Sequence, residues 1–83
     1  MADHEKHFKL IINTREKTWD NSSISYKDAV ILAFGSYSED PNTIYTVDYF
    51  KGPKENPEGS LTKGQSVEVK NGMIFNVTET HKS

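Results

Sequence analysis

Residues 64–83 carry two runs of alternating apolar and polar side chains, one on each side of the dipeptide Asn71-Gly72. The apolar side chains occupy every second position, at Val67, Val69, Met73, Phe75 and Val77. Asn-Gly tolerates positive φ at both central positions of a type I′ turn, whose twist matches that of the flanking strands. The segment is therefore predicted to form a β-hairpin with a type I′ turn, and its second strand is predicted to be the last element of the domain.

The size and charge of the chain limit what it can do. At 83 residues it is expected to form one core and no deep substrate cleft, since roughly 60% of the unfolded surface is buried at this size. Ten basic and twelve acidic residues are well mixed, with a net charge of −2, so no nucleic-acid partner is expected. The absence of cysteine excludes disulfides and thiolate chemistry. Without a long apolar stretch, neither a secretory signal nor a membrane span is expected, and the expected location is cytoplasmic.

The rest of the chain reads as a strand hairpin, one helix, one strand and a long loop. Residues 8–12 alternate as a strand, residues 14–16 are a predicted turn, and residues 17–20 a return strand. Ser25 is a predicted N-cap, Asp28 completes a capping box, and Gly35 ends a helix of about ten residues. Residues 44–50 are rich in β-branched and aromatic side chains and predict a strand, followed by a surface loop over residues 51–63.

This order of elements predicts an α+β fold of the β-grasp type, in which a mixed sheet wraps around one helix. The first and last strands are the most apolar, so they are expected to be parallel neighbours at the sheet centre, joined by a crossover that contains the helix. A generic α+β roll is the alternative. The expected organisation is a polar leader over residues 1–6, a domain over residues 7–78 and a flexible C-terminal tail over residues 79–83.

No residue set predicts catalysis, a metal site or a cofactor. His4 and His7 have the spacing of half a metal site, but the chain has no cysteine and only His81 besides, so a solvated segment is expected instead. A protein-binding surface is predicted at Ile11, Ile74 and Asn76. If the alternate residues of the first and last strands face the helix, the two isoleucines point to the open face of the sheet. The alternative is that these isoleucines are incidental surface residues.

Five segments of the chain, spread from about Lys6 to the end, resemble a domain of the bacterial multiubiquitin family of ubiquitin-like proteins. They are Phe8-x-Leu10-x-Ile12-Asn13, residues 24–34 with Ile24-Ser25-Tyr26, Tyr45-Thr46-Val47, residues 57–67 with Pro57-Glu58-Gly59-Ser60-Leu61, and Asn71-Gly72-Met73-Ile74-Phe75-Asn76-Val77-Thr78. The resemblance implies a ubiquitin-like β-grasp fold and a role as a protein modifier without enzyme activity of its own. It implies ubiquitin-activating-like and conjugating-like enzymes and a deubiquitinase-like protease as partners.

The resemblance also implies a reactive or processed C-terminal tail, formed by Thr78, Glu79, Thr80, His81, Lys82 and Ser83. Ubiquitin-type conjugation uses a C-terminal Gly-Gly, which fits a narrow enzyme channel, and this chain contains no Gly-Gly. Cleavage within the tail and activation at the Ser83 carboxylate are both open. The alternative function is a β-grasp interaction module that is never conjugated. The protein is expected to be a monomer.

Overall fold

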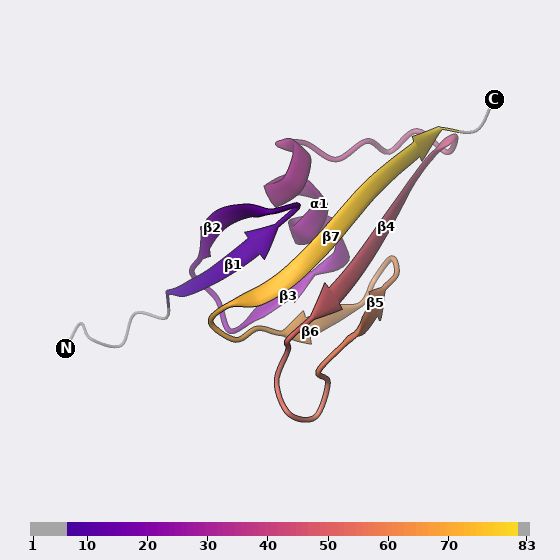
Figure 1. Ribbon diagram of the computed structural model, residues 1–83. Coiled ribbons are helices and arrows are strands. Elements are labelled where there is room, and N and C mark those ends of the chain that lie inside the picture. The colour runs from indigo at the N-terminus through magenta and orange to yellow at the C-terminus, as the bar shows by residue number, and fades with distance from the viewer. Residues whose placement is uncertain (1–6, 82–83) are drawn as a thin grey trace.

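The computed structural model describes residues 7–81, which form two layers, a five-stranded sheet and a layer that contains the single helix (Figure 1). The five-stranded sheet has the order β2-β1-β7-β4-β5, and a second sheet pairs β3 with β6. In chain order the elements are β1 (Phe8–Ile12), β2 (Arg15–Trp19), β3 (Ser23–Ser25), α1 (Tyr26–Phe34), β4 (Thr43–Phe50), β5 (Gly59–Leu61), β6 (Ser66–Glu68) and β7 (Met73–His81).

The structure confirms the α+β fold with a ubiquitin-like β-grasp. The first and last strands, β1 and β7, are parallel neighbours at the sheet centre, with Ile11 opposite Ile74. The connection between them contains α1, as parallel pairing requires. Strand alternation directs Leu10 and Phe75 into the core, where both are fully buried. The most apolar strands thus lie where both of their edges are paired.

The helix α1 begins and ends where its capping residues predict. The Ser25 hydroxyl accepts a hydrogen bond from the backbone N–H of Asp28 at 3.0 Å, and the Asp28 carboxylate accepts one from the backbone N–H of Ser25 at 3.3 Å. Gly35 ends the helix at φ 86°, a conformation that favours glycine. No helix within residues 7–81 has the length and apolar content needed to cross a membrane.

Tyr26, at the first position of the helix, ties α1 to the sheet. Its hydroxyl donates a hydrogen bond to the backbone carbonyl of Tyr45, at 2.9 Å. Burial raises the pKa of the Tyr26 phenol, and the neighbouring Tyr37 and Tyr45 phenols raise it further. Because the net shift is upward, the phenol stays protonated and remains a donor at neutral pH.

The predicted closing hairpin is wrong, because β6 and β7 are not paired. β6 pairs antiparallel with β3, placing Val67 opposite Ile24, and the N–H of Val69 donates to the Ser22 carbonyl at 3.0 Å. At its start, along residues 73–75, β7 has β1 on one side and β4 on the other, so no edge is left there for β6. The alternation correctly marked two half-buried strands, but it did not specify which strands they pair with.

The predicted type I′ turn at Asn71-Gly72 is also wrong. Only Gly72 has positive φ, at 85°, and the N–H of Met73 donates to the Lys70 carbonyl at 3.0 Å. A single positive φ at the third residue of such a turn is typical of type II. Lys9 of β1 imposes this shape, because its N–H donates to the Asn71 side-chain oxygen at 2.9 Å and its carbonyl accepts from the Gly72 N–H at 2.7 Å.

A type I′ geometry occurs instead in the first hairpin, at the two-residue loop Asn13-Thr14. Their φ angles are 53° and 70°, and Ile12 lies opposite Arg15 across the loop. Positive φ at both central positions defines this turn type, which joins twisted strands most directly. The loop therefore lies one residue earlier than the turn predicted at residues 14–16, and it contains no glycine. Thr14 is β-branched and is strained in this conformation.

The Asn13 side chain extends the pairing of β1 with β7 past the end of β1. The Asn13 backbone N–H donates to the Phe75 carbonyl at 2.9 Å. Its side-chain amide then donates to the Val77 carbonyl at 3.0 Å, while its side-chain oxygen accepts from the Val77 N–H at 2.7 Å. The Asn13 side chain thus does what the backbone of a longer β1 would do. It hydrogen-bonds both the N–H and the C=O of Val77.

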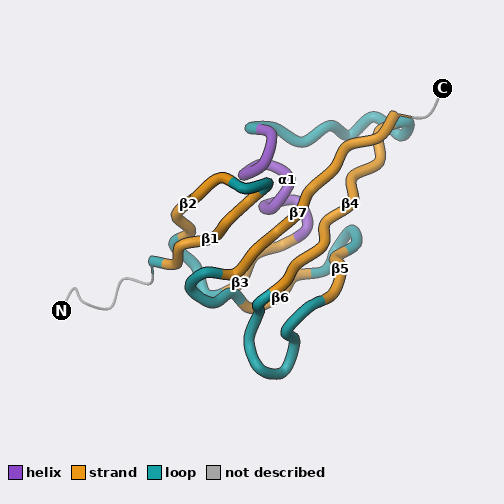
Figure 2. Tube along the Cα trace, viewed as in Figure 1, coloured by secondary structure: helices purple, strands orange, loops and turns teal. Residues whose placement is uncertain are grey.

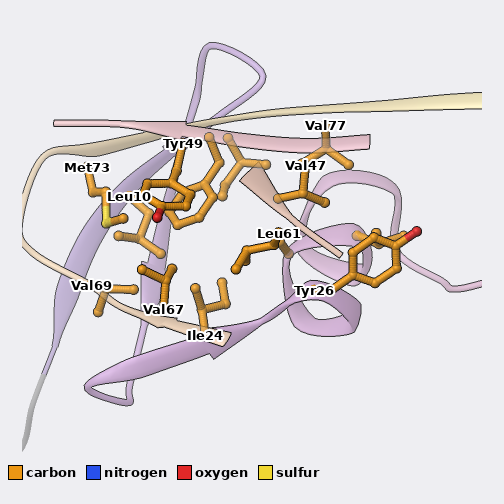
Figure 3. Packing of buried hydrophobic residues seen from close by; sticks show 14 of the residues in the cluster. Leu10, Ile24, Tyr26, Val47, Tyr49, Leu61, Val67, Val69, Met73 and Val77 are labelled. Carbon is orange, nitrogen blue, oxygen red and sulfur yellow. The ribbon is translucent and has the colours of Figure 1, made fainter. Parts of the chain in front are cut away.

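The core lies between the five-stranded sheet and a layer made by α1 and the β3–β6 pair. Figure 3 shows Ile24, Val67 and Val69 on one side of this core and Leu10, Tyr49 and Met73 on the other. The side chains that are almost completely buried are Phe75, Leu10, Ile12, Ile24, Met73, Val30 and Val47. The β3–β6 pair therefore closes the end of the core that the nine-residue helix is too short to cover.

We expect Asn13→Gly to lower the free energy of unfolding by about 1–3 kcal/mol, because two hydrogen bonds to Val77 are lost while the positive φ remains allowed. Thr14→Gly is the matched control in the same turn. It removes a strained β-branched residue, and we expect a gain of about 1 kcal/mol after the entropy cost of glycine. Urea unfolding measures both changes. Equal effects of the two substitutions would show that the Asn13 side chain does not hold β7.

Candidate binding face and C-terminal arm

The open face of the sheet, opposite the helix, carries a row of apolar side chains across its three central strands. The row consists of Ile11 of β1, Ile74 of β7 and Phe50 of β4, because the register places Ile74 opposite both of the others. Ile11 and Ile74 are half-buried, and Phe50 is 38% exposed. The structure thus brings the two predicted isoleucines together and adds an aromatic ring to them.

Phe50 was not part of the surface predicted from the sequence. The alternation of β4 contains a signal for its exposure. Tyr45, Val47 and Tyr49 are buried, so Phe50 must point to the opposite face. Its place beside Ile74 depends on the register between β4 and β7, which alternation does not specify.

Polar groups surround the apolar row. At one end, Lys9 and Glu16 form an exposed ion pair of 3.5 Å. Beside the row, Asn76 is exposed and lies opposite Asp48, whose carboxylate accepts a hydrogen bond of 2.6 Å from the Ser60 hydroxyl. Exposed pairs of this kind contribute little to stability. An apolar centre with a polar rim is the usual arrangement of a protein-binding surface.

The predicted C-terminal tail is largely part of the last strand. Thr78, Glu79, Thr80 and His81 all belong to β7, and they pair with β4 down to His81 opposite Thr43. Lys82 and Ser83 lie outside the described residues. Figure 2 shows β7 and β4 continuing together well past the end of β1. We call the four residues Thr78–Glu79–Thr80–His81, with the part of β4 opposite them, the C-terminal arm.

Aromatic side chains hold the arm against the helix and the loop that follows it. Tyr37 stacks on Tyr45 with ring centroids 5.3 Å apart, and it meets Tyr26 edge-on at 6.1 Å. The ring centroid of Phe34, at the end of α1, lies 6.0 Å from that of Tyr45. The Lys27 ammonium lies 5.5 Å from the Tyr37 ring centroid, a cation–π distance. The arm is therefore an extension of the core and has its own small apolar support.

Polar side chains of the arm pair with each other on the face that carries Tyr45. Glu79 and His81 are separated by 3.0 Å between a carboxylate oxygen and Nε2, and the other ring nitrogen of His81 lies 3.4 Å from the Thr43 hydroxyl. His7 lies at the other end of β1, where its Nδ1 is 2.8 Å from Asp20, while His4 lies outside the described residues. Within residues 7–81 no three acidic or histidine side chains gather as metal ligands.

Comparison with known protein families identifies the whole described domain. A family model described as Multiubiquitin matches residues 8–81. The match begins at the first residue of β1 and ends at the last residue of β7, so the arm is included in it. No curated protein and no solved structure shows a significant match to the chain.

Hydrogen exchange should show a two-residue pattern along the arm. The N–H of Val77 points to Asn13, so by strand alternation those of Thr78 and Thr80 point to β4 and those of Glu79 and His81 point away. For the single domain at low protein concentration, we expect slow exchange at Thr78 and Thr80 and fast exchange at Glu79 and His81, by about tenfold or more. Fast exchange at all four amides, measured by NMR, would instead indicate a free tail.

Proposed function

The chain belongs to the multiubiquitin family, and from this we propose that it is a ubiquitin-like protein modifier without catalytic activity. In this proposal, a ubiquitin-activating-like enzyme and a deubiquitinase-like protease act on its C-terminal tail, and a conjugating-like enzyme receives it. The observation that carries the proposal is the apolar row of Ile11, Ile74 and Phe50 on the open sheet face, in which Ile74 lies on the strand that leads into the arm.

The chemistry requires a free carboxylate, either at Ser83 or at a residue exposed by cleavage in the tail. This carboxylate attacks the α-phosphate of ATP, which forms an acyl-adenylate and releases pyrophosphate. A cysteine thiolate of the activating enzyme then displaces AMP to form a thioester, and a target amine displaces the thiolate to form an amide. The chain has no cysteine, so the thiol must come from the enzyme.

The geometry supports docking and reaction at different places on the domain. The apolar row lies on the open face at the sheet centre, and the arm extends from the same strand past the end of β1. An enzyme that docks on the row can therefore reach along β7 to the arm. Burying a fully exposed isoleucine contributes about 1.5–3 kcal/mol, and because Ile11 and Ile74 are already half-buried, docking on the row gains only part of this from each.

A second candidate function is a β-grasp interaction module that is never conjugated. Two observations favour it. The sequence lacks Gly-Gly, and residues 78–81 pair with β4, so an enzyme channel would have to separate them from the sheet before it could bind them. In this case the apolar row would bind a partner, and the arm would be structural.

Reconstitution with the activating enzyme and ATP distinguishes the two functions, and intact mass measures the outcome. We expect an adenylate or a covalent adduct of the domain. The matched variant carries Glu79→Gln, Thr80→Val and His81→Tyr. These substitutions change the side chains that an enzyme would contact but still allow residues 79–81 to form a strand. A modifier should lose its adduct in this variant, whereas an interaction module should form no adduct in either protein and keep its partner affinity.

Ile11→Asp combined with Ile74→Asp should abolish partner binding, because two charges replace the centre of the apolar row. The fold should be retained, since both side chains are partly exposed. Thr18→Asp with Thr46→Asp is the matched control, on the same face but outside the row, and should bind normally. Calorimetry and circular dichroism measure binding and folding. Intact binding would place the interface elsewhere, such as the loop at Pro57-Glu58-Gly59-Ser60 or the tail.

A further inference from the structure

The C-terminal arm has an unpaired edge on the side where β1 has ended. Up to Phe75 this side of β7 pairs with β1, and the Asn13 side chain takes both backbone groups of Val77. Strand alternation directs the N–H and C=O groups of Glu79 and His81 to the same side. Among the described residues, no strand lies beside them there, because the only other partner of β7 is β4. These groups can accept another strand.

The other two edges of the five-stranded sheet are better protected from pairing than this one. The free edge of β2 carries Arg15, Glu16 and Lys17, and the outer strand β5 has only three residues. Charged and very short edge strands resist pairing with other chains. The arm instead presents Thr78, Glu79, Thr80 and His81, in which two β-branched residues alternate with a carboxylate and an imidazole that contact each other at 3.0 Å. Its backbone is extended and ready to pair.

We propose that a second copy of this chain pairs with the edge, antiparallel and centred on Thr80. In this register, Glu79 of each copy lies opposite His81 of the other, so both cross-strand pairs join a carboxylate to an imidazole. Each of these pairs exchanges two backbone hydrogen bonds. The sequence of the arm is therefore self-complementary, as a two-fold symmetric interface requires.

The neighbouring registers are disfavoured because they place like side chains opposite each other or require backbone groups that are already hydrogen-bonded. Centring the pair on Glu79 places two carboxylates opposite each other, and like charges in that position are destabilising. It also places His81 opposite Val77, whose backbone groups are already bonded to Asn13. Centring the pair on His81 brings the two imidazoles together and leaves Glu79 without His81 opposite it. The register centred on Thr80 is the one that matches opposite groups at both positions.

An apolar surface lies beside the proposed contact. Phe34 is 42% exposed and its ring lies 6.0 Å from Tyr45, which is the cross-strand neighbour of Glu79. The His81 ring of the second copy would lie next to Glu79 on this face. The paired stretch is short, so the contact falls in the class of small, transient interfaces below roughly 1,200 Å². We expect self-association that depends on protein concentration. This differs from the monomer expected from the sequence.

Exchanging the charges tests the register directly. His81→Glu places Glu79 opposite a second glutamate, and Glu79→Lys removes the carboxylate that faces His81 of the other copy, so each variant alone should associate about tenfold more weakly. A mixture of the two restores opposite charges at both positions, and the heterodimer should form with the affinity of the original protein. The double variant E79K/H81E should also recover self-association. Sedimentation equilibrium and concentration-dependent NMR shifts at residues 78–81 measure these outcomes.

Matched controls separate the edge from net charge and from folding. Lys54→Glu and Glu55→Lys make similar charge changes on the exposed loop between β4 and β5, and they should leave association unchanged. Loss of the Glu79–His81 contact within one chain would weaken each single variant but could not restore association in the mixture. Shifts that do not change with concentration, or a mixture that associates no better than its components, would overturn the proposal. The result is independent of whether the chain is conjugated.

Discussion

The parallel pairing of β1 with β7 is the interaction on which the remaining structure depends. Two asparagines hold this pair, one at each end. The Asn71 side chain accepts a hydrogen bond from Lys9 where the pair begins, and the Asn13 side chain bonds both backbone groups of Val77 where it ends. Backbone donors and acceptors left unpaired inside a fold are costly. Side-chain amides therefore complete a ladder that the five-residue strand β1 is too short to provide.

This pair also determines how the two layers meet. Because β7 has β1 on one side and β4 on the other, the preceding strand β6 must find a partner elsewhere. It pairs with β3, and the resulting small sheet covers the core beside α1, with Ile24 and Val67 facing the large sheet (Figure 3). The same arrangement leaves the opposite face of the large sheet uncovered. The apolar row lies on an open face because both α1 and the β3–β6 pair pack on the other side of the sheet.

Much of the fold could be predicted from the sequence because local rules and the tertiary structure agree. The alternation in residues 8–12 and 73–77 determined which side chains face the core, and this placed Ile11 and Ile74 on the open face. Ser25, Asp28 and Gly35 determined the limits of the helix. Pairing could not be predicted in the same way. An alternating strand reads the same whichever neighbour it has, so β6 was assigned to β7, and Phe50 was not placed beside Ile74. The predicted turn type was wrong because the hydrogen bonds with Lys9 determine the backbone conformation at Asn71-Gly72, and they override the preference of this dipeptide for a type I′ turn.

The direction of the central strands has a mechanical consequence. β1 and β7 are adjacent and parallel, so the start of β1 and the end of β7 lie at opposite ends of the pair. A force that pulls Phe8 and His81 apart therefore slides the two strands along each other and loads their hydrogen bonds together. Strands pulled from the same end would instead open one bond at a time, under a much smaller force. Tension along the chain thus acts on the strongest direction of this domain, and the Asn13 and Asn71 side chains bear part of the load.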